Sequence, residues 1–66
     1  MVVNINGEQE VMPDGTDLYG IITGKGLEPD KVLVEHNLEI VPREKWRFTK
    51  VNEGDNVEIF AFVGGG

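Results

Sequence analysis

The stretch VVNINGEQEVM (residues 2–12) contains the clearest fold signal in the chain. Val3 and Ile5 alternate with polar residues, which is the pattern of a strand with one buried face, so both are expected to point inward. Asn6-Gly7 follows directly, and both residues tolerate the positive φ that a two-residue type I′ turn requires. We therefore predict a hairpin whose second strand runs over residues 8–12.

A short helix is expected after the turn PDGT at residues 13–16. Thr16 is the predicted N-cap, and Asp17 would lie in the first turn beside the positive end of the helix. Two glycines, Gly20 and Gly24, each cost a helix about 1 kcal/mol relative to alanine. The helix therefore depends on packing against a sheet. It carries an apolar stripe at i, i+3, i+4 spacing for this purpose: Leu18, Ile21 and Ile22.

The remaining segments complete a small α+β domain. Connections are short throughout, so consecutive elements must be neighbours, and one helix can pack across one face of a mixed sheet in a ββαββ order. The opposite face of the sheet is then open to solvent or to a partner. The elements expected after the helix are a strand at 31–36 with Val32 and Val34 on one face, a short strand at 38–41, a helical turn at 42–46, a turn at 54–55 or 55–56 and a final strand at 57–63.

The alternation along the final strand predicts two faces with different roles. The core-facing set is Val57, Ile59 and Ala61. The other set is Glu58, Phe60 and Phe62. Two phenylalanines on the open face would form a docking surface for a partner, because exposed apolar patches mark interaction sites. Two alternatives stay open: a loop covers these phenylalanines, or the parity is reversed and they belong to the core.

The composition excludes several classes of function. The chain has 66 residues, no cysteine and one histidine, His36, so a thiolate nucleophile, a disulfide framework and a multi-histidine metal site are not available. The chain has twelve acidic side chains and six lysines or arginines, and the net charge of −6 is spread along the sequence. Nucleic acid is therefore not expected as a partner, because phosphate binding needs a concentrated basic patch. The same charge suits either a partner with a basic surface or simple solubility.

The sequence shows no sign of membrane association. No apolar run approaches the roughly 20 residues that span a bilayer, and the N-terminus lacks the pattern of a signal peptide. A cytoplasmic protein is therefore expected. His36 follows a strand beside a turn and is expected to be exposed. The carboxylates of Glu8, Glu10, Glu35 and Glu39 lack the pocket that acid–base catalysis needs, so they are interpreted as a solvated acidic surface.

The segment IVPREKW at residues 40–46 is expected to be structural. Pro42 fixes a turn and takes the first position of a short helix. Trp46 is expected to cap one edge of the core with its indole N–H near the surface. Arg43 and Glu44 are interpreted as a solvated pair, with contact to a partner as the alternative.

These features together resemble the ThiS family, the sulfur carriers of thiazole biosynthesis. The resemblance covers essentially the whole chain and rests on the ββαββ order, the Gly-Asp turn at 54–55 and the Gly-Gly terminus. A Gly-Gly terminus is shared by ubiquitin-like proteins in general and does not distinguish ThiS from the others. The VPRE-x-W segment, which includes Val41, Pro42 and Trp46, is the feature that favours ThiS. The resemblance implies the β-grasp fold of ubiquitin, in which the first and last strands lie side by side in the middle of the sheet.

The resemblance also implies a role for the C-terminal glycines. In the family, a ThiF-like adenylyltransferase uses Mg-ATP to adenylate the C-terminal carboxylate, which a sulfur donor system converts into a thiocarboxylate for thiazole synthase. Gly66 corresponds to the terminal glycine and Gly65 to the one before it, while Gly64 extends the tail. The expected organisation is a β-grasp domain at 1–63 and a flexible tail at 64–66. The chain would be a monomeric protein cosubstrate and not an enzyme, with no bound cofactor or metal.

Elementary chemistry is consistent with such a tail. A carboxylate is a poor electrophile because its charge is delocalised over two oxygens, whereas an acyl-adenylate carries a good leaving group. Glycine has no Cβ, so its backbone can pass through a narrow channel toward a partner's active site. Three residues reach at most about 10 Å beyond the last strand.

Three other functions stay open at this point. The small subunit of molybdopterin synthase shares the fold, the Gly-Gly end and the thiocarboxylate, although the short chain and the VPRE-x-W segment favour thiazole synthesis. A ubiquitin-like modifier would use the same adenylate to form isopeptide bonds with lysines. A plain interaction module would have no tail chemistry at all.

Overall fold

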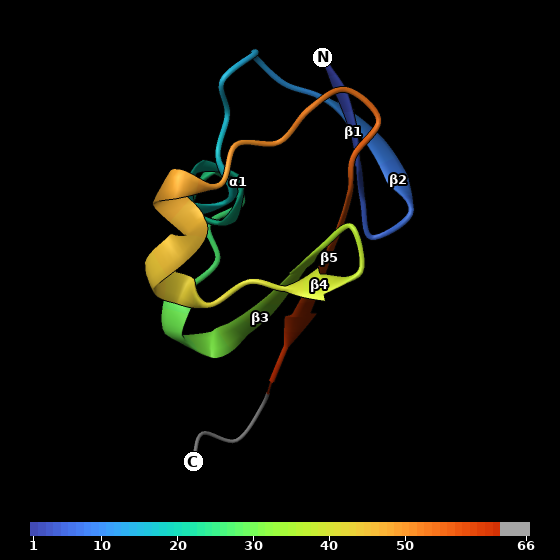
Figure 1. The fold of residues 1–66 in the computed structure, drawn as a ribbon. Helices are drawn as coiled ribbons and strands as arrows, with labels where there is room; N and C mark the ends of the chain where they lie inside the picture. The colour runs from blue at the N-terminus through green and yellow to red at the C-terminus, as the bar shows by residue number, and fades with distance from the viewer. Residues whose placement is uncertain (63–66) are drawn as a thin grey trace.

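The structure is a computed structural model that describes residues 1–62. A mixed sheet with the strand order β2-β1-β5-β3-β4 packs against α1 and the 3-10 helix η2, which lie together on one side of it (Figure 1). The parallel pair β1 and β5 is central, and the other pairs are antiparallel. The elements are β1 (Val2–Ile5), β2 (Glu8–Val11), α1 (Leu18–Gly24), η1 (Pro29–Lys31), β3 (Val32–His36), β4 (Glu39–Ile40), η2 (Arg43–Phe48) and β5 (Asn56–Ala61).

This topology confirms the β-grasp expectation, including the placement of the first and last strands side by side. Three strands follow α1, as the sequence predicts, and the expected short strand at 38–41 is the two-residue β4. The differences lie at the ends of elements, and Lys31, expected in a strand, belongs to η1. β2 ends at Val11, and β5 begins at Asn56 and ends at Ala61, so the predicted second strand is one residue too long and the predicted last strand is shifted.

The first hairpin forms as predicted. Asn6 has φ 51° and Gly7 has φ 82°, the left-handed backbone that the two-residue turn demands. Ile5 then lies opposite Glu8 in the antiparallel register. Val3 and Ile5 are both buried against the helix side of the sheet, so the period-2 pattern assigned the correct face.

The N-cap of α1 is Asp17, so the prediction of Thr16 is wrong by one residue. The Asp17 side chain accepts a hydrogen bond of 2.7 Å from the Gly20 N–H, which otherwise has no partner in the first helical turn. The Thr16 hydroxyl instead donates to the Pro13 carbonyl oxygen at 2.7 Å and closes the preceding turn. Both residue types can cap a helix, and the geometry of the turn decides between them.

The helix ends at Gly24 in a glycine-based cap. Gly26 has φ 74°, and its N–H donates to the Thr23 carbonyl at 3.0 Å while the Leu27 N–H donates to the Ile22 carbonyl at 3.1 Å. These two bonds satisfy carbonyls that the helix end would leave unpaired. A helix of seven residues is too short to be stable alone, so burial of its apolar stripe holds it in place.

The core lies between the sheet and the pair formed by α1 and η2. Trp46 on η2 is 1% exposed, and its indole Nε1–H donates to the Val41 carbonyl oxygen at 2.8 Å. The ring is buried in the core, and its N–H finds a backbone acceptor on the half-buried Val41. Pro42 precedes η2 as its N-cap and is not its first residue. Within residues 1–62, the core side chains are Val3, Ile5, Leu18, Ile21, Ile22, Val32, Val34, Trp46, Val51 and Val57.

Candidate partner-docking face

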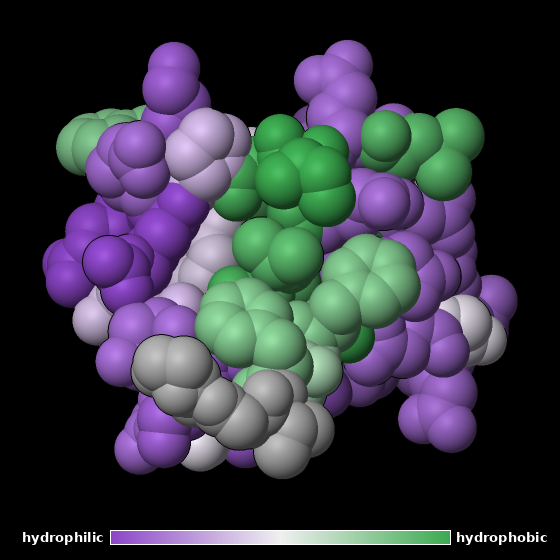
Figure 2. All heavy atoms as spheres, turned by 90° about the horizontal axis from the view of Figure 1, so that it is seen from below, coloured by the Kyte–Doolittle hydropathy of each residue, from purple (hydrophilic) through white to green (hydrophobic). Residues whose placement is uncertain are grey.

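The face of the sheet opposite α1 carries a strip of exposed apolar side chains. On β5, Val57 is buried and Ile59 packs against the core, while Phe60 is 46% exposed. Leu33 lies directly opposite Phe60 on β3 and is 48% exposed. Figure 2 shows apolar side chains gathered in one strip with hydrophilic surface on both sides. We define the apolar strip as Leu33, Ile40, Phe60 and Phe62.

The structure therefore confirms the predicted parity of the last strand at the positions that matter for the strip. Phe60 and Phe62 are about half exposed, which excludes a reversed parity, and no loop within residues 1–62 covers them. One residue departs from the pattern. Ala61 was expected to face the core but is exposed. It is the last residue of β5 and is not part of the core cluster.

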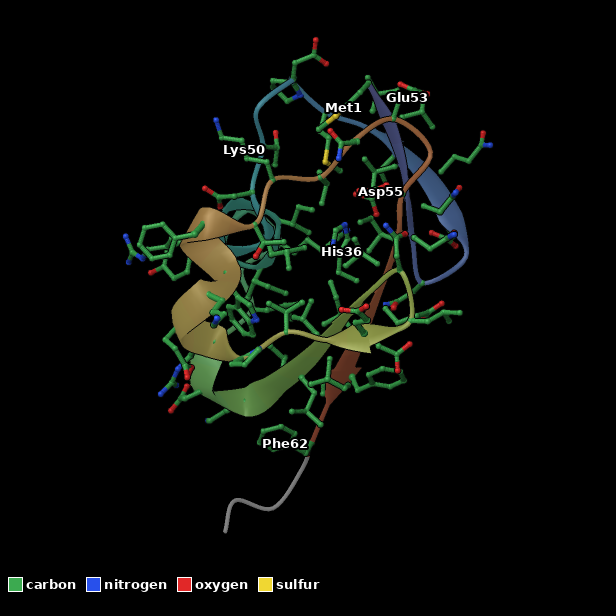
Figure 3. The ribbon with its side chains drawn as sticks, viewed as in Figure 1. Met1, His36, Lys50, Glu53, Asp55 and Phe62 are labelled. Atoms are coloured by element: carbon green, nitrogen blue, oxygen red, sulfur yellow. The ribbon has the colours of Figure 1, made fainter. Side chains whose placement is uncertain are left out.

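Phe62 marks the point where the strip meets the C-terminal segment. Its N–H donates to the Lys31 carbonyl oxygen at 3.1 Å, which continues the pairing of β5 with β3 by one more hydrogen bond. Phe62, Leu33, Ile40 and Pro42 are among the residues that line an open groove of about 270 Å³. Figure 3 shows Phe62 at the C-terminal end of β5, away from His36 and Asp55.

The predicted reactive residue and its neighbours, Gly64, Gly65 and Gly66, lie outside the described residues. The same holds for Val63, which the sequence placed in the last strand. The chain leaves the described structure directly after Phe62. The site can therefore be built up to the edge of the strip, and the chemistry assigned to Gly66 remains a prediction.

Glu58, the third predicted docking residue, is half-buried on the open face. It lies directly opposite Glu35 on β3. Glu35 is also half-buried, so it is less exposed than its assignment to a solvated acidic surface implied. Glu10, from the same assignment, pairs with Lys25 at 2.6 Å between the side-chain oxygen and nitrogen.

His36 is not exposed, contrary to the expectation. Its Nε2 lies 2.8 Å from Asp55 Oδ2, and both side chains are largely buried between the end of β3 and the start of β5 (Figure 3). Burial has the largest effect on the pKa of Asp55 and raises it, but several hydrogen bonds, led by the one from His36, outweigh burial and hold this pKa below its ordinary value. The Asn52 N–H also donates to Asp55 Oδ2, at 2.8 Å. This pair fastens two strand ends and is far from the strip.

The other surfaces of the described chain lie away from the strip. Arg43 and Glu44 are exposed, as expected of solvated side chains. An open groove of about 460 Å³ lies between β2 and α1, next to Gly20 and Gly24. Within residues 1–62, no three acidic, histidine or cysteine side chains are placed to hold one metal ion. The helices of this part of the chain are all too short or too polar to cross a membrane.

Comparison with known proteins decides the family. Residues 2–66 match the sequence model of the ThiS family. The chain belongs to the ThiS family. A crystal structure of a thiamine biosynthesis protein (ThiS) from Geobacter metallireducens superposes on this ThiS-family protein with a TM-score of 0.81 and 31% identity, covering 100% of both chains.

Two thiazole synthases also match this ThiS-family protein. The one from Paramagnetospirillum magneticum is 41% identical over 66 residues, and the one from Magnetococcus marinus is 38% identical over 66 residues. In each case the match covers 100% of this chain and 20% of the relative. The chain therefore spans a fifth of the length of the thiazole synthases that it matches.

Sequence reasoning missed two members of the strip in this ThiS-family protein, Leu33 and Ile40. The signal was present for Leu33, because it alternates with Val32 and Val34 and must point to the opposite face. Ile40 could be assigned only once the register was known, since β4 has two residues and too little alternation to define a face.

Proposed function

We propose that this protein is a sulfur carrier of thiazole biosynthesis and that the carboxylate of Gly66 is its reactive group. Membership of the ThiS family supports the carrier role, and the thiazole synthase relatives support the thiazole branch over molybdopterin synthesis. The observation that carries the proposal is the apolar strip ending at Phe62. A partner that covers this strip lies beside the point from which Val63–Gly66 continue.

The proposed chemistry takes place on a partner enzyme. The Gly66 carboxylate attacks the α-phosphorus of Mg-bound ATP, which forms an acyl-adenylate and releases pyrophosphate. A sulfide-level nucleophile from the sulfur donor system then attacks the acyl carbon, and AMP leaves with the bonding electrons. The product is a thiocarboxylate, which thiazole synthase consumes. The carrier supplies no catalytic side chain in this scheme and acts as a protein cosubstrate.

The residues before Gly66 have separate roles in the proposal. Gly65 and Gly64 pass through the channel that leads to the ATP site, where a Cβ would narrow the clearance. Phe60, Phe62 and Glu58 contact the ThiF-like adenylyltransferase and hold the carrier while the carboxylate reacts. The carrier is proposed to be a cytoplasmic monomer that forms transient complexes, first with this enzyme and then with thiazole synthase.

A ubiquitin-like modifier shares the adenylate and differs only in the acceptor. It predicts covalent conjugates of higher mass on a denaturing gel, because lysine amines would attack the activated carbonyl. The carrier predicts release of a free thiocarboxylate instead. Incubation with the activating enzyme, Mg-ATP and a cell extract distinguishes these outcomes.

The proposal is tested by adenylation of a protein whose C-terminal carboxylate is replaced by a carboxamide. This variant keeps every side chain and loses only the nucleophilic oxygen. With the ThiF-like adenylyltransferase of the source organism, the unmodified protein should support exchange of labelled pyrophosphate into ATP, and the carboxamide protein should not. Equal exchange with both proteins would place the reaction elsewhere and overturn the proposal.

A further inference from the structure

Two carboxylates on the open face of the sheet face each other directly. Glu35 on β3 and Glu58 on β5 are partners in the antiparallel register. Both are on the face away from the core, since Val34 and Val57, their neighbours in sequence, are buried on the other side. Side chains in such positions are close enough to interact, and like charges placed directly opposite each other destabilise a sheet.

The described chain does not compensate this repulsion. None of the ion pairs among residues 1–62 includes Glu35 or Glu58. The two lysines that form ion pairs in the described chain bind other carboxylates: Lys25 pairs with Glu10, and Lys31 pairs with Glu28. The pair therefore lowers the stability of the fold, and no ion pair within residues 1–62 offsets this. We take this as a sign that the two carboxylates serve a contact with another molecule.

The pair also lies at the margin of the apolar strip. The next outward-facing partners along β3 and β5 are Leu33 and Phe60, and Ile40 is the register partner of Glu35 on its other side. A partner that covers the strip must therefore also cover the two carboxylates. Removing them from water without a counter-charge would be costly, and a cation placed between them removes that cost.

We propose that Glu35 and Glu58 together receive a basic side chain of the adenylyltransferase that covers the apolar strip. This inference rests on the proposed function and adds the chemistry of the partner surface: an apolar centre flanked by a lysine or, better, an arginine, whose planar fork can reach two carboxylates. A second copy of this chain does not fit, because it would bring one acidic margin against another, with 12 acidic and 6 basic side chains in each copy.

The test compares two charge-matched double variants as substrates of the ThiF-like adenylyltransferase. Glu35→Gln/Glu58→Gln removes the pair with little change in shape, and Glu8→Gln/Asp14→Asn removes two carboxylates from the hairpin and the loop after it. The first variant should raise KM about fivefold at low salt, leave kcat unchanged and flatten the salt dependence of kcat/KM. The control should keep the wild-type KM within a factor of about two.

Thermal unfolding separates docking from folding in the same experiment. Removal of the like-charge repulsion should leave the melting temperature of Glu35→Gln/Glu58→Gln equal to or above that of the wild type, so weaker adenylation cannot reflect unfolding. Equal KM and equal salt dependence in both double variants would overturn this inference but not the proposed function. A loss confined to kcat would have the same meaning. A wild-type chain that is not adenylated would overturn the proposed function, and this partner with it.

Discussion

Leu33 and Phe60 lie directly opposite each other on β3 and β5, and both side chains are about half exposed on the open face of the sheet. A cross-strand apolar pair in this position is available to a partner but contributes little to the core. Phe60→Ser should therefore raise the KM for adenylation about tenfold, from the loss of roughly 1.5 kcal/mol of apolar burial. The melting temperature should change little.

Phe48→Ser is the matched control for this prediction. Phe48 is 84% exposed on η2, on the helix side of the sheet, so its replacement should leave both KM and melting temperature near the wild-type values. If Phe60→Ser unfolds the protein, Phe60 is a core residue and the docking role is wrong.

Trp46 is the side chain on which the fold should depend most. It is 1% exposed and satisfies its N–H with the Val41 carbonyl oxygen. Trp46→Phe keeps an aromatic ring but removes the hydrogen bond and leaves space, so the free energy of unfolding should fall by about 1–3 kcal/mol. Urea unfolding followed by circular dichroism measures this, and a fall below about 0.5 kcal/mol would contradict the buried position.

Asp55 should make stability depend on pH at the acid end. Because its pKa is held below the ordinary value, its carboxylate stabilises the folded state fully above about pH 4 and loses that contribution as pH falls through the lowered pKa. Asp55→Asn should cost about 1 kcal/mol at neutral pH, from weaker hydrogen bonds to His36 and the Asn52 N–H. The difference from wild type should shrink below pH 4.

Asp14→Asn is the control for the pH measurement, because the Asp14 side chain is 93% exposed. Its unfolding free energy should follow the wild-type pH curve. A difference between wild type and Asp55→Asn that grows on acidification would mean that the charged form of Asp55 does not stabilise the fold.

Asp17 and Thr16 are adjacent, and the sequence alone did not show which of them caps α1. Asp17→Ala should lower the free energy of unfolding by about 1 kcal/mol, because the Gly20 N–H loses its acceptor. Thr16→Ala removes only the hydroxyl bond to Pro13 and should cost less than half as much. Thermal unfolding of the two variants measures the order, and a larger effect at Thr16 would restore it as the cap.

The parts of the fold that the sequence predicted correctly depend on patterns of residues that are close together in the chain. Asn6-Gly7 determines the first turn because few residue types accept its backbone conformation. The outward position of Phe60 follows from alternation with Val57 and Ile59, which needs no knowledge of the rest of the chain. The same alternation would have identified Leu33.

The features that were missed depend on contacts between distant segments. His36 pairs with Asp55, which lies 19 positions away in the sequence. The residues next to each of them give no pattern that predicts this contact. Likewise, the facing of Glu35 and Glu58 exists only in the register of β3 against β5.

The most direct test of the carrier role is the intact mass of the protein after incubation with the ThiF-like adenylyltransferase, Mg-ATP and sulfide. We predict a shift equal to the replacement of one oxygen by sulfur, located by fragmentation in the terminal Gly65-Gly66 segment. An unchanged mass, with an enzyme that activates another carrier under the same conditions, would contradict the central claim.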